Sequence, residues 1–526
     1  MKKYLELIKY EFGISVLFIL SHLPSLGIDN FNTDVWKWKK RIFDFSSGVF
    51  GLRPEETVQT YHPGVPLMWL GTIAIKFYNL SKDIFNNGQD YPDVREIFYL
   101  DFAQKFLVVL GIAVGVFFML CALRKILGTK GVVVAGLLLM FEPFYLALTR
   151  VIHLEGLTST YLVASLLWLY VWGQARKKLY LSISAILGVI AVLTKTSALI
   201  IVPFSFVYIL LLTKHPKDIL KWFAVFVVTA LVMWPALLFK PMYVINYLYT
   251  GVTEVGIEEG HDQFYFGNYV TDPGWTFYFV SIAYRTSPAV FVLFIVSLLG
   301  LLRYKSESRK FIFYILAFIL LYLVEITLPT KKLDRYMLPI LIAMVVCSSV
   351  FLNYVMEAFK HRYVWVISLL AIVSSLFYSV TSHPIYLNYY SPLFGGLGAG
   401  IHVIEPKWLI GTNEIISYFR DVKSKEGLSD FKQGENIENL LYSPLLASKL
   451  TVAFPEKYYT QIHPFFRLIN SWAVIEDLSG QAVKTKFFVY PVWDDYSNRE
   501  TRFKLEYYGD ISIGEVPVYK VYKRVI

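Results

Sequence analysis

The segment Lys331-Lys332-Leu333-Asp334-Arg335-Tyr336 stands between two apolar runs, residues 311–328 and 335–356. Each run is close to the roughly 20 residues that cross a bilayer as a helix. The basic segment therefore marks a short connection between two membrane spans. Connections rich in lysine and arginine normally lie in the cytoplasm, so the meaning of this one depends on the side of the membrane on which it falls.

The composition of the chain is that of a polytopic α-helical membrane protein. Hydrophobic residues make up 56% of the 526 residues, charged residues only 17%, and the mean hydropathy is +0.50. A soluble protein would carry about 25% charged residues. The net charge of +10 then reflects basic loops and anion binding. We expect membrane lipids as partners and no nucleic acid, because no nucleic-acid-binding motif accompanies the charge.

A topology of eleven spans with a cytoplasmic N-terminus places all five inner loops on basic segments. The apolar run 64–80 is assigned to the outer interface, because counting it as a span would reverse every later loop. The C-terminus and the 331–336 segment then lie outside the cell membrane, where an anionic ligand such as a lipid phosphate explains the cations. The expected spans are about 11–28, 97–122, 130–148, 156–173, 180–194, 197–213, 219–238, 276–302, 311–328, 335–356 and 363–380.

The composition changes near residue 383, which predicts two domains. Residues 1–382 form a transmembrane domain whose first outer loop spans about 29–80. Residues 383–526 are more polar and are expected to form a small extracytoplasmic α/β domain. Its expected elements are a helix over 409–422 and strands over 486–492, 503–508 and 516–522, where β-branched and aromatic residues alternate with polar ones.

Under this topology the polar residues of several loops gather at the outer face. Each also has a structural interpretation: Asp34 could cap a helix, His62 could belong to a turn, and Arg150 could reach lipid headgroups. Asp101 and Lys105, four residues apart within a span, are expected to pair with each other. The candidate site residues are Asp34, His62, Arg150, His153, Glu155, Lys195, His261, Tyr265, Arg285, Lys331, Lys332, Arg335 and Tyr336.

Acids and cations at one outer-face site favour group transfer from a lipid-linked donor. Neither ATP nor nucleotide sugars are present outside the cytoplasm, so an activated donor has to arrive through the membrane, as a lipid phosphate can. A carboxylate can then take the proton of an acceptor while cations stabilise the departing phosphate. No spacing of ligand residues demands a metal, and Cys121 and Cys347 each lie within an apolar run; a divalent metal is not excluded.

The order of the motifs resembles the C-type glycosyltransferases, namely the dolichyl-phosphate-mannose protein mannosyltransferase family and the related bacterial aminoarabinose-lipid A transferases. The likeness is greatest to bacterial family-39-type enzymes and covers about residues 10–420. Its motifs are Asn32-Thr33-Asp34-Val35-Trp36, Thr60-Tyr61-His62-Pro63-Gly64-Val65, Phe141-Glu142-Pro143-Phe144, Thr149–Glu155, Leu193-Thr194-Lys195, the 261–275 loop, Lys332–Tyr336 and Tyr386–Gly396.

The resemblance implies an inverting transfer of a sugar from a polyprenyl-phosphate donor to a protein, lipid or glycan, with juxtamembrane helices in the first outer loop. It implies that Asp34 is the catalytic base, that Glu155 orients a substrate, and that Lys331, Lys332 and Arg335 bind the donor phosphate. Glu155 departs from the family pattern, which has Asp there. No dedicated metal or other cofactor is implied.

Two other classes compete with the enzyme. A transporter or flippase for a polyprenyl-phosphate-linked or other anionic lipid also needs outer cations, but it should carry charges along a path through the membrane. A sensor with an outer ligand-binding domain would have no use for Asp34 and Glu155. Charges within the spans are sparse, which favours the glycosyltransferase.

Overall fold

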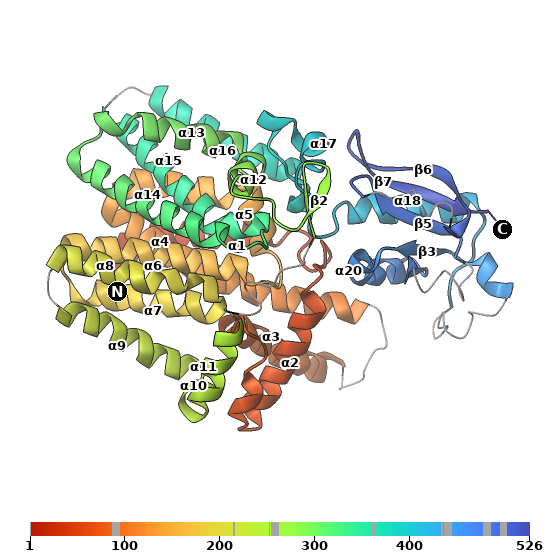
Figure 1. Ribbon diagram of the computed structural model, residues 1–526, viewed down its shortest axis with the longest axis horizontal. Helices are drawn as coiled ribbons and strands as arrows, with labels where there is room; N and C mark the ends of the chain where they lie inside the picture. The colour runs from red at the N-terminus through yellow and green to blue at the C-terminus, as the bar shows by residue number, and fades with distance from the viewer. Residues whose placement is uncertain are drawn as a thin grey trace.

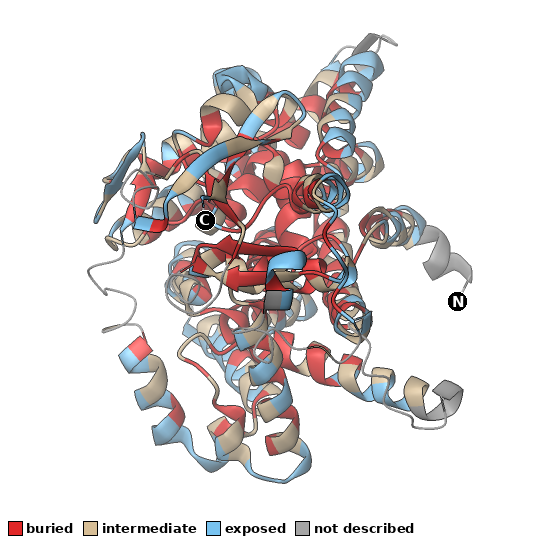
Figure 2. Cartoon of the chain, turned by 90° about the vertical axis from the view of Figure 1, so that its right-hand side faces the viewer, coloured by how far each residue is buried: buried red, intermediate tan, exposed pale blue. Residues whose placement is uncertain are grey.

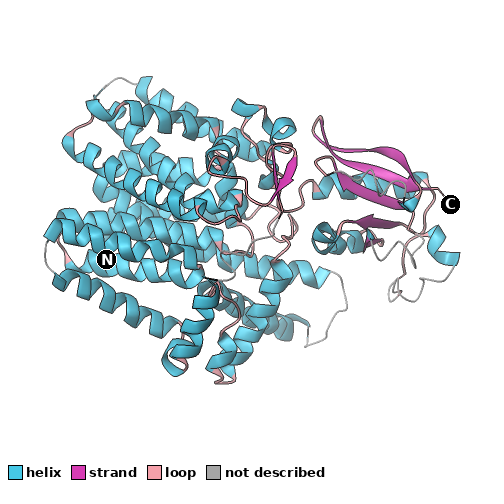
Figure 3. Cartoon of the chain, in the orientation of Figure 1, coloured by secondary structure: helices cyan, strands magenta, loops and turns pink. Residues whose placement is uncertain are grey.

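The computed structural model describes residues 2–86, 95–213, 216–251, 253, 262–358, 363–432, 435, 444–476, 485–494 and 502–525. Most of these residues are helical, and the strands lie almost entirely toward the C-terminus (Figures 1 and 3). The helices of the first part are α1 (Lys2–His22), α2 (Val35–Phe50), α3 (Val65–Asn86), α4 (Arg95–Met140), α5 (Pro143–Thr149), α6 (Glu155–Ala175), α7 (Lys178–Thr194), α8 (Ile201–Thr213), α9 (Pro216–Met233), α10 (Ala236–Phe239), α11 (Pro241–Thr250), α12 (Phe277–Arg285), α13 (Pro288–Leu299), α14 (Ser306–Thr327), α15 (Leu338–Ala358) and α16 (Tyr363–Thr381).

The surface of the helical part is that of a membrane protein. Large apolar side chains stand exposed on its outer helices, among them Leu211 at 76% and Val232 at 74%. In the end-on view of Figure 2, buried residues fill the middle of the molecule and exposed faces belong to peripheral helices. Among the described residues, four helices are long and apolar enough to cross a bilayer: Arg95–Met140, Thr196–Thr213, Ser306–Thr327 and Asp334–Ala358. The predicted number of eleven spans remains a prediction.

One expected span is divided into two helices in the structure. The run 276–302 was expected to be one helix, but α12 ends at Arg285 and α13 begins at Pro288. Pro288 has no N–H to donate and is well suited to the first turn of a helix, and the Ser287 side chain caps the Val290 N–H. Glu142 fixes this break, because it accepts hydrogen bonds from Ser287 N at 2.8 Å and Ser287 Oγ at 2.5 Å.

The expected spans 97–122 and 130–148 also have different limits. They share α4, which is broken at Gly128, where φ is +71°. The second part ends at Met140, and Pro143 starts the separate short helix α5. The loop expected over 239–275 contains α11 and a hairpin of β1 (Gln263–Tyr265) and β2 (Asn268–Val270).

The segment predicted to be the first outer loop, residues 29–80, is held by a buried ion network. Lys105 Nζ lies 2.8 Å from Asp101 and 2.6 Å from Asp29, and Arg150 pairs with Asp29 at 3.3 Å. Lys39 of α2 reaches Asp101 at 2.9 Å, so the expected Asp101–Lys105 pair is part of a larger set. The network fixes α2, which runs across the direction of the long helices in Figure 1.

The C-terminal part contains a five-stranded sheet in the order β4-β3-β5-β7-β6. The predicted strands at 486–492, 503–508 and 516–522 coincide with β5 (Phe487–Pro491), β6 (Leu505–Ile513) and β7 (Val516–Arg524), and the predicted helix with α18 (Thr412–Lys425). The strands β3 (Thr451–Phe454) and β4 (Trp472–Ile475) and the helix α20 (Glu456–Leu468) were not predicted. The predicted domain boundary at residue 383 remains a prediction.

Helix α20 packs directly on the first outer loop. Trp36 Nε1 donates to the Thr460 carbonyl at 2.7 Å. The ring of Phe465 lies 5.6 Å from that of Phe31 and 5.2 Å from that of Phe98. The C-terminal part therefore helps to hold the segment that carries Asp34.

Candidate active site

Asp34 occupies the position before α2 without capping that helix. Its side chain accepts no hydrogen bond from the first turn of α2, so the helix-cap interpretation does not account for its carboxylate. Its own N–H donates to Asn32 Oδ1 at 2.9 Å, which fixes the turn. The side chain is 30% exposed. The carboxylate is therefore anchored through its backbone and open to a substrate.

His62 lies just before α3, later in the same loop than Asp34. Gly64 donates its N–H to the Thr194 carbonyl at 3.0 Å, and its φ of +62° together with the Trp38 ring leaves no room for a Cβ atom. His62 Nδ1 lies 3.1 Å from Thr196 Oγ1. Burial, followed by the charge of Lys195, lowers the pKa of His62 to about 3, so His62 is a neutral hydrogen-bonding group.

His153 joins two carboxylates. Its Nε2 lies 3.4 Å from Asp34 Oδ2, and its Nδ1 contacts Glu155 Oε2. Burial lowers the pKa of His153, but the charge of Glu155 and the hydrogen bond to Asp34 outweigh burial and raise it overall. The two acids therefore favour the protonated form of the imidazole.

Two further cations lie on the other side of Glu155. Lys195 Nζ lies 3.0 Å and Arg335 Nε 3.2 Å from the same oxygen, Glu155 Oε1. Arg335 Nη2 is also 4.0 Å from Asp34 Oδ2. Lys195 follows α7 and Arg335 belongs to the 3-10 turn Asp334–Met337, so four separate segments of the chain build this charge cluster.

The surroundings keep both carboxylates ionised. Burial raises the pKa of Asp34, but the hydrogen bond and charge of His153, and then the charge of Arg335, lower it below its usual range. Burial likewise raises the pKa of Glu155, and the charges of His153 and Lys195 lower it well below its usual range. Asp34 is therefore able to accept a proton at neutral pH.

Aromatic rings enclose the cations, and one of them was not among the predicted site residues. Lys195 Nζ lies 3.8 Å from the centre of the Tyr336 ring. Trp408 lies 5.1 Å from both the His153 ring and the Arg335 guanidinium. It stands next to Lys407, with which it lines a cavity of about 10 Å³ beside Arg335. That volume is close to one water molecule, so a larger ligand at Arg335 has to displace existing contacts.

Three predicted ligand-binding cations are engaged elsewhere. Arg150 is buried and donates to the carbonyls of His22 and Pro24 as well as to Asp29. Arg285 is also buried and pairs with Asp334 at 2.8 Å. Lys332 is buried and bonds to Asp272 at 2.6 Å and to the Pro329 carbonyl at 2.8 Å. In the structure Lys332 and Arg335 take different partners, Asp272 and Glu155, and their grouping at one phosphate remains a prediction.

For the remaining predicted residues, Tyr265, Lys331 and His261, the described part of the structure gives no contact with the charge cluster. Tyr265 donates to or accepts from Thr276 Oγ1 at 3.0 Å, outside the charge cluster. Lys331 is half-buried. Burial lowers the pKa of Lys407, and the charge of Lys331 contributes to this lowering. His261 lies outside the described residues. Within the part of the chain that the structure describes, no group of three or more His, Cys, Asp or Glu side chains is arranged to hold a metal ion.

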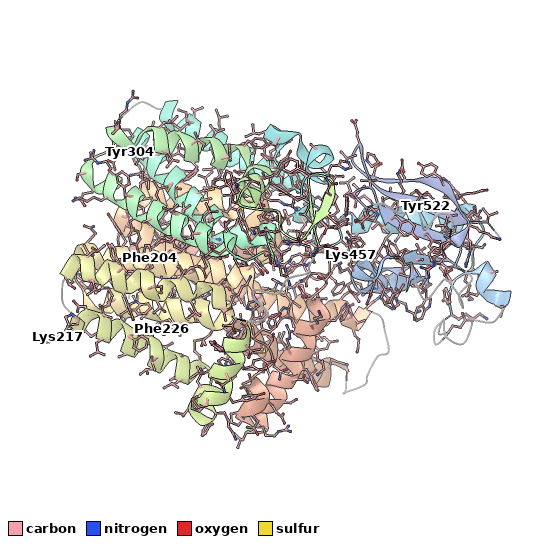
Figure 4. All side chains as sticks on the ribbon, viewed as in Figure 1. Phe204, Lys217, Phe226, Tyr304, Lys457 and Tyr522 are labelled. Carbon is pink, nitrogen blue, oxygen red and sulfur yellow. The ribbon has the colours of Figure 1, made fainter. Side chains whose placement is uncertain are left out.

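Residues 405–409, which include Trp408, are held by helix α20. Glu405 accepts from Lys457 of α20 at 3.0 Å, and Lys457 lies at the junction of the two parts in Figure 4. The Leu409 N–H donates to Gln461 of the same helix at 2.8 Å. A helix of the C-terminal part therefore holds the segment that closes the site.

No model of a known protein family and no curated protein matches this sequence. Among solved structures, the chain is similar to ArnT from Cupriavidus metallidurans bound to undecaprenyl phosphate, with 11% identity over 97% of both chains and a TM-score of 0.49. It is also similar to the oligosaccharyltransferase AglB from Archaeoglobus fulgidus in complex with an inhibitory peptide and a dolichol-phosphate, with 13% identity over 92% of this chain and 69% of that chain and a TM-score of 0.45. With identities of 11% and 13% and TM-scores below 0.5, these two neighbours carry no argument about this chain. At such identities and scores, the activity of this chain has to be argued from its own residues.

Proposed function

We propose that this chain is a membrane-bound glycosyltransferase that moves a sugar, with inversion, from a polyprenyl-phosphate-linked donor to an acceptor at the outer face of the cell membrane. The observation that carries the proposal is the charge cluster in which His153 joins Asp34 to Glu155, while Lys195 and Arg335 share one oxygen of Glu155. It combines an ionised, accessible carboxylate with cations that suit a leaving phosphate.

Asp34 serves as the general base. The acceptor hydroxyl gives its proton to the Asp34 carboxylate as the acceptor oxygen bonds to the anomeric carbon of the sugar. The bond from that carbon to the phosphate oxygen breaks on the opposite face, which inverts the configuration. General-base catalysis of this kind contributes about 10²–10⁴-fold.

Lys195 and Arg335 receive the phosphate. The phosphate leaves with the bonding electron pair, so negative charge grows next to the cations as the bond breaks. Arginine and lysine form charge-assisted hydrogen bonds to phosphate. Both cations contact Glu155 Oε1, so a phosphate that binds them takes the place of this oxygen. Glu155 is then free to orient the sugar or the acceptor.

The arrangement of the other charges does not favour a transporter. The charged residues of α4 near its outer end, Asp101 and Lys105, are buried and paired. Glu142 accepts two hydrogen bonds from Ser287. These groups hold helices and loops together, and the charges of the site gather at one end of the helical part. We therefore retain the transferase and leave the acceptor, whether protein, lipid or glycan, to experiment.

The test compares Asp34→Asn with Asp44→Asn, which removes a second carboxylate from the same helical region. Asp44 is half-exposed and pairs only with Lys40 at the surface among the described contacts. Mass spectrometry of membrane lipids and glycans from cells with and without the gene identifies the modified species. We expect Asp44→Asn to restore that species to a deletion strain and Asp34→Asn to restore about 10²-fold less or none. Equal restoration by the two variants would overturn the proposal.

A further inference from the structure

A second cavity lies at the end of the helical part opposite the candidate active site. Glu155 begins α6 and Ala175 ends it, which places the two ends of this 21-residue helix about 30 Å apart. The cavity lies at the Ala175 end and has a volume of about 410 Å³, within the range of about 300–1,000 Å³ typical of ligand sites. In Figure 4, Tyr304 and Lys217 mark this end of the helical part, and Lys457 lies where the helical part meets the C-terminal part.

Two cations converge at this cavity without an opposing carboxylate of their own. The Nζ atoms of Lys125 and Lys177 lie 5.2 Å and 5.8 Å from the centre of the same ring, that of Tyr180. Among the described residues, neither lysine has a carboxylate within 4.0 Å. Glu307, which also lines the cavity, pairs with Lys310 at 3.3 Å. An anion in the cavity could form charge-assisted contacts with these two lysines.

Most of the remaining lining is apolar or aromatic, and Gln174 and Ser308 are its polar members. Tyr170 packs against Phe311 with ring centres 4.7 Å apart, and Leu127 and Val171 complete this wall. The first turns of α7 and α14 contribute Tyr180 and Ser308. A site lined both by cations and by an apolar wall suits a molecule that has both a phosphate and a hydrocarbon part.

We propose that this cavity binds the headgroup phosphate of an anionic membrane phospholipid. The expected topology puts this end of the helices in the cytoplasmic leaflet, where anionic lipids are concentrated and basic pockets between membrane helices bind their headgroups. A soluble phosphate compound shares the charge but has no use for the apolar wall, so we assign the lipid. The site is separate from the transfer site and independent of the sugar donor.

The test measures lipid retention by native mass spectrometry. The full-length protein is reconstituted in nanodiscs of phosphatidylcholine with a minor fraction of phosphatidylglycerol and then released. The variant Lys125→Gln/Lys177→Gln removes both cations of the cavity. The control Lys217→Gln/Lys221→Gln removes two positive charges from α9 at the same end of the molecule, outside the cavity. The variant Lys125→Arg/Lys177→Arg keeps the charge.

We expect the native protein, the control and the arginine variant to retain one phosphatidylglycerol in preference to phosphatidylcholine. The glutamine variant of the cavity should lose this preference by about tenfold or more, since two charge-assisted contacts are lost. Equal preference in the glutamine variant and the control would overturn the proposal. Displacement of the lipid by millimolar inorganic phosphate would overturn the lipid assignment and identify a soluble anion instead.

Discussion

Two charged clusters are built around the first outer loop, and they differ in what their charges face. The structural cluster consists of Asp29, Lys39, Asp101, Lys105 and Arg150, and the site cluster of Asp34, His153, Glu155, Lys195 and Arg335. In the structural cluster Lys39 is 12% exposed and the other four side chains at most 2%. In the site cluster Asp34 is 30% exposed, Arg335 11%, and His153, Glu155 and Lys195 at most 9%.

We infer from this difference that the structural cluster holds the loop in place and that the site cluster acts on a substrate. Each charge of the structural cluster has an opposite charge within 3.3 Å, and Arg150 also satisfies two backbone carbonyls. In the site cluster two cations share one oxygen of Glu155, and Asp34 keeps an exposed carboxylate. A phosphate in the site cluster would give Lys195 and Arg335 a further negative charge to bind. In the structural cluster it could bind only by breaking existing ion pairs.

The largest effect on stability is expected from Arg150→Met. Removing one partner from a buried ion pair leaves Asp29 with less compensation and costs about 3–5 kcal/mol. Thermal unfolding of the purified protein in detergent should show a much lower transition temperature or no folded protein. Arg303→Met, which removes an exposed arginine from the opposite end of the molecule, is the control and should unfold like the native protein. A native transition temperature for Arg150→Met would place Arg150 outside the structural cluster.

Glu155→Gln should affect turnover without weakening the phosphate site. The substitution removes the anion that competes with phosphate for Lys195 and Arg335, so polyprenyl phosphate should bind at least as tightly as before. Loss of the orienting carboxylate should lower the transfer rate by about tenfold or more. Separate measurements of lipid-phosphate binding and of transfer check both parts. Weaker binding would show that Glu155 shapes the phosphate site.

His153→Gln should shift the pH dependence of transfer. Asp34 accepts a proton only when ionised, and this capacity is lost as pH falls through the pKa of Asp34. The hydrogen bond and charge of His153 lower that pKa, so their removal raises it, and the acid limb of the rate profile moves to higher pH. The shift is measured on the native protein and the variant in parallel. An unchanged acid limb would mean that Asp34 is not the group that titrates.

Much of the site's placement could be predicted from the sequence, because topology alone assigns residues to one face. Asp34, His153, Glu155 and Lys195 all lie at the expected outer ends of spans, and the structure brings them together. The sequence could not separate Lys332 from Arg335. The 3-10 turn Asp334–Met337 directs them to different partners, and Asp272, the partner of Lys332, is distant in sequence.

Other differences between the sequence-based predictions and the structure come from contacts between segments that are distant in sequence. Trp408 enters the site because α20 holds its segment, and no local pattern indicates that contact. The strands β3 and β4 have only four residues each, too few for a clear alternation. The break at Ser287 did have a local signal, since Ser287-Pro288 is a common start of a helix, but the long apolar run concealed it.

The central claim is that Arg335 binds the donor phosphate and that Lys332, which pairs with Asp272, does not. The most direct test is to compare the affinities of Arg335→Gln and Lys332→Gln for polyprenyl phosphate in nanodiscs. The two residues are three positions apart, and only Arg335 belongs to the site cluster. We expect Arg335→Gln to weaken binding by about tenfold or more, as the loss of a charge-assisted contact of about 1.5–3 kcal/mol requires, and Lys332→Gln to bind like the native protein. Unchanged binding by Arg335→Gln, or a greater loss in Lys332→Gln, would contradict the account.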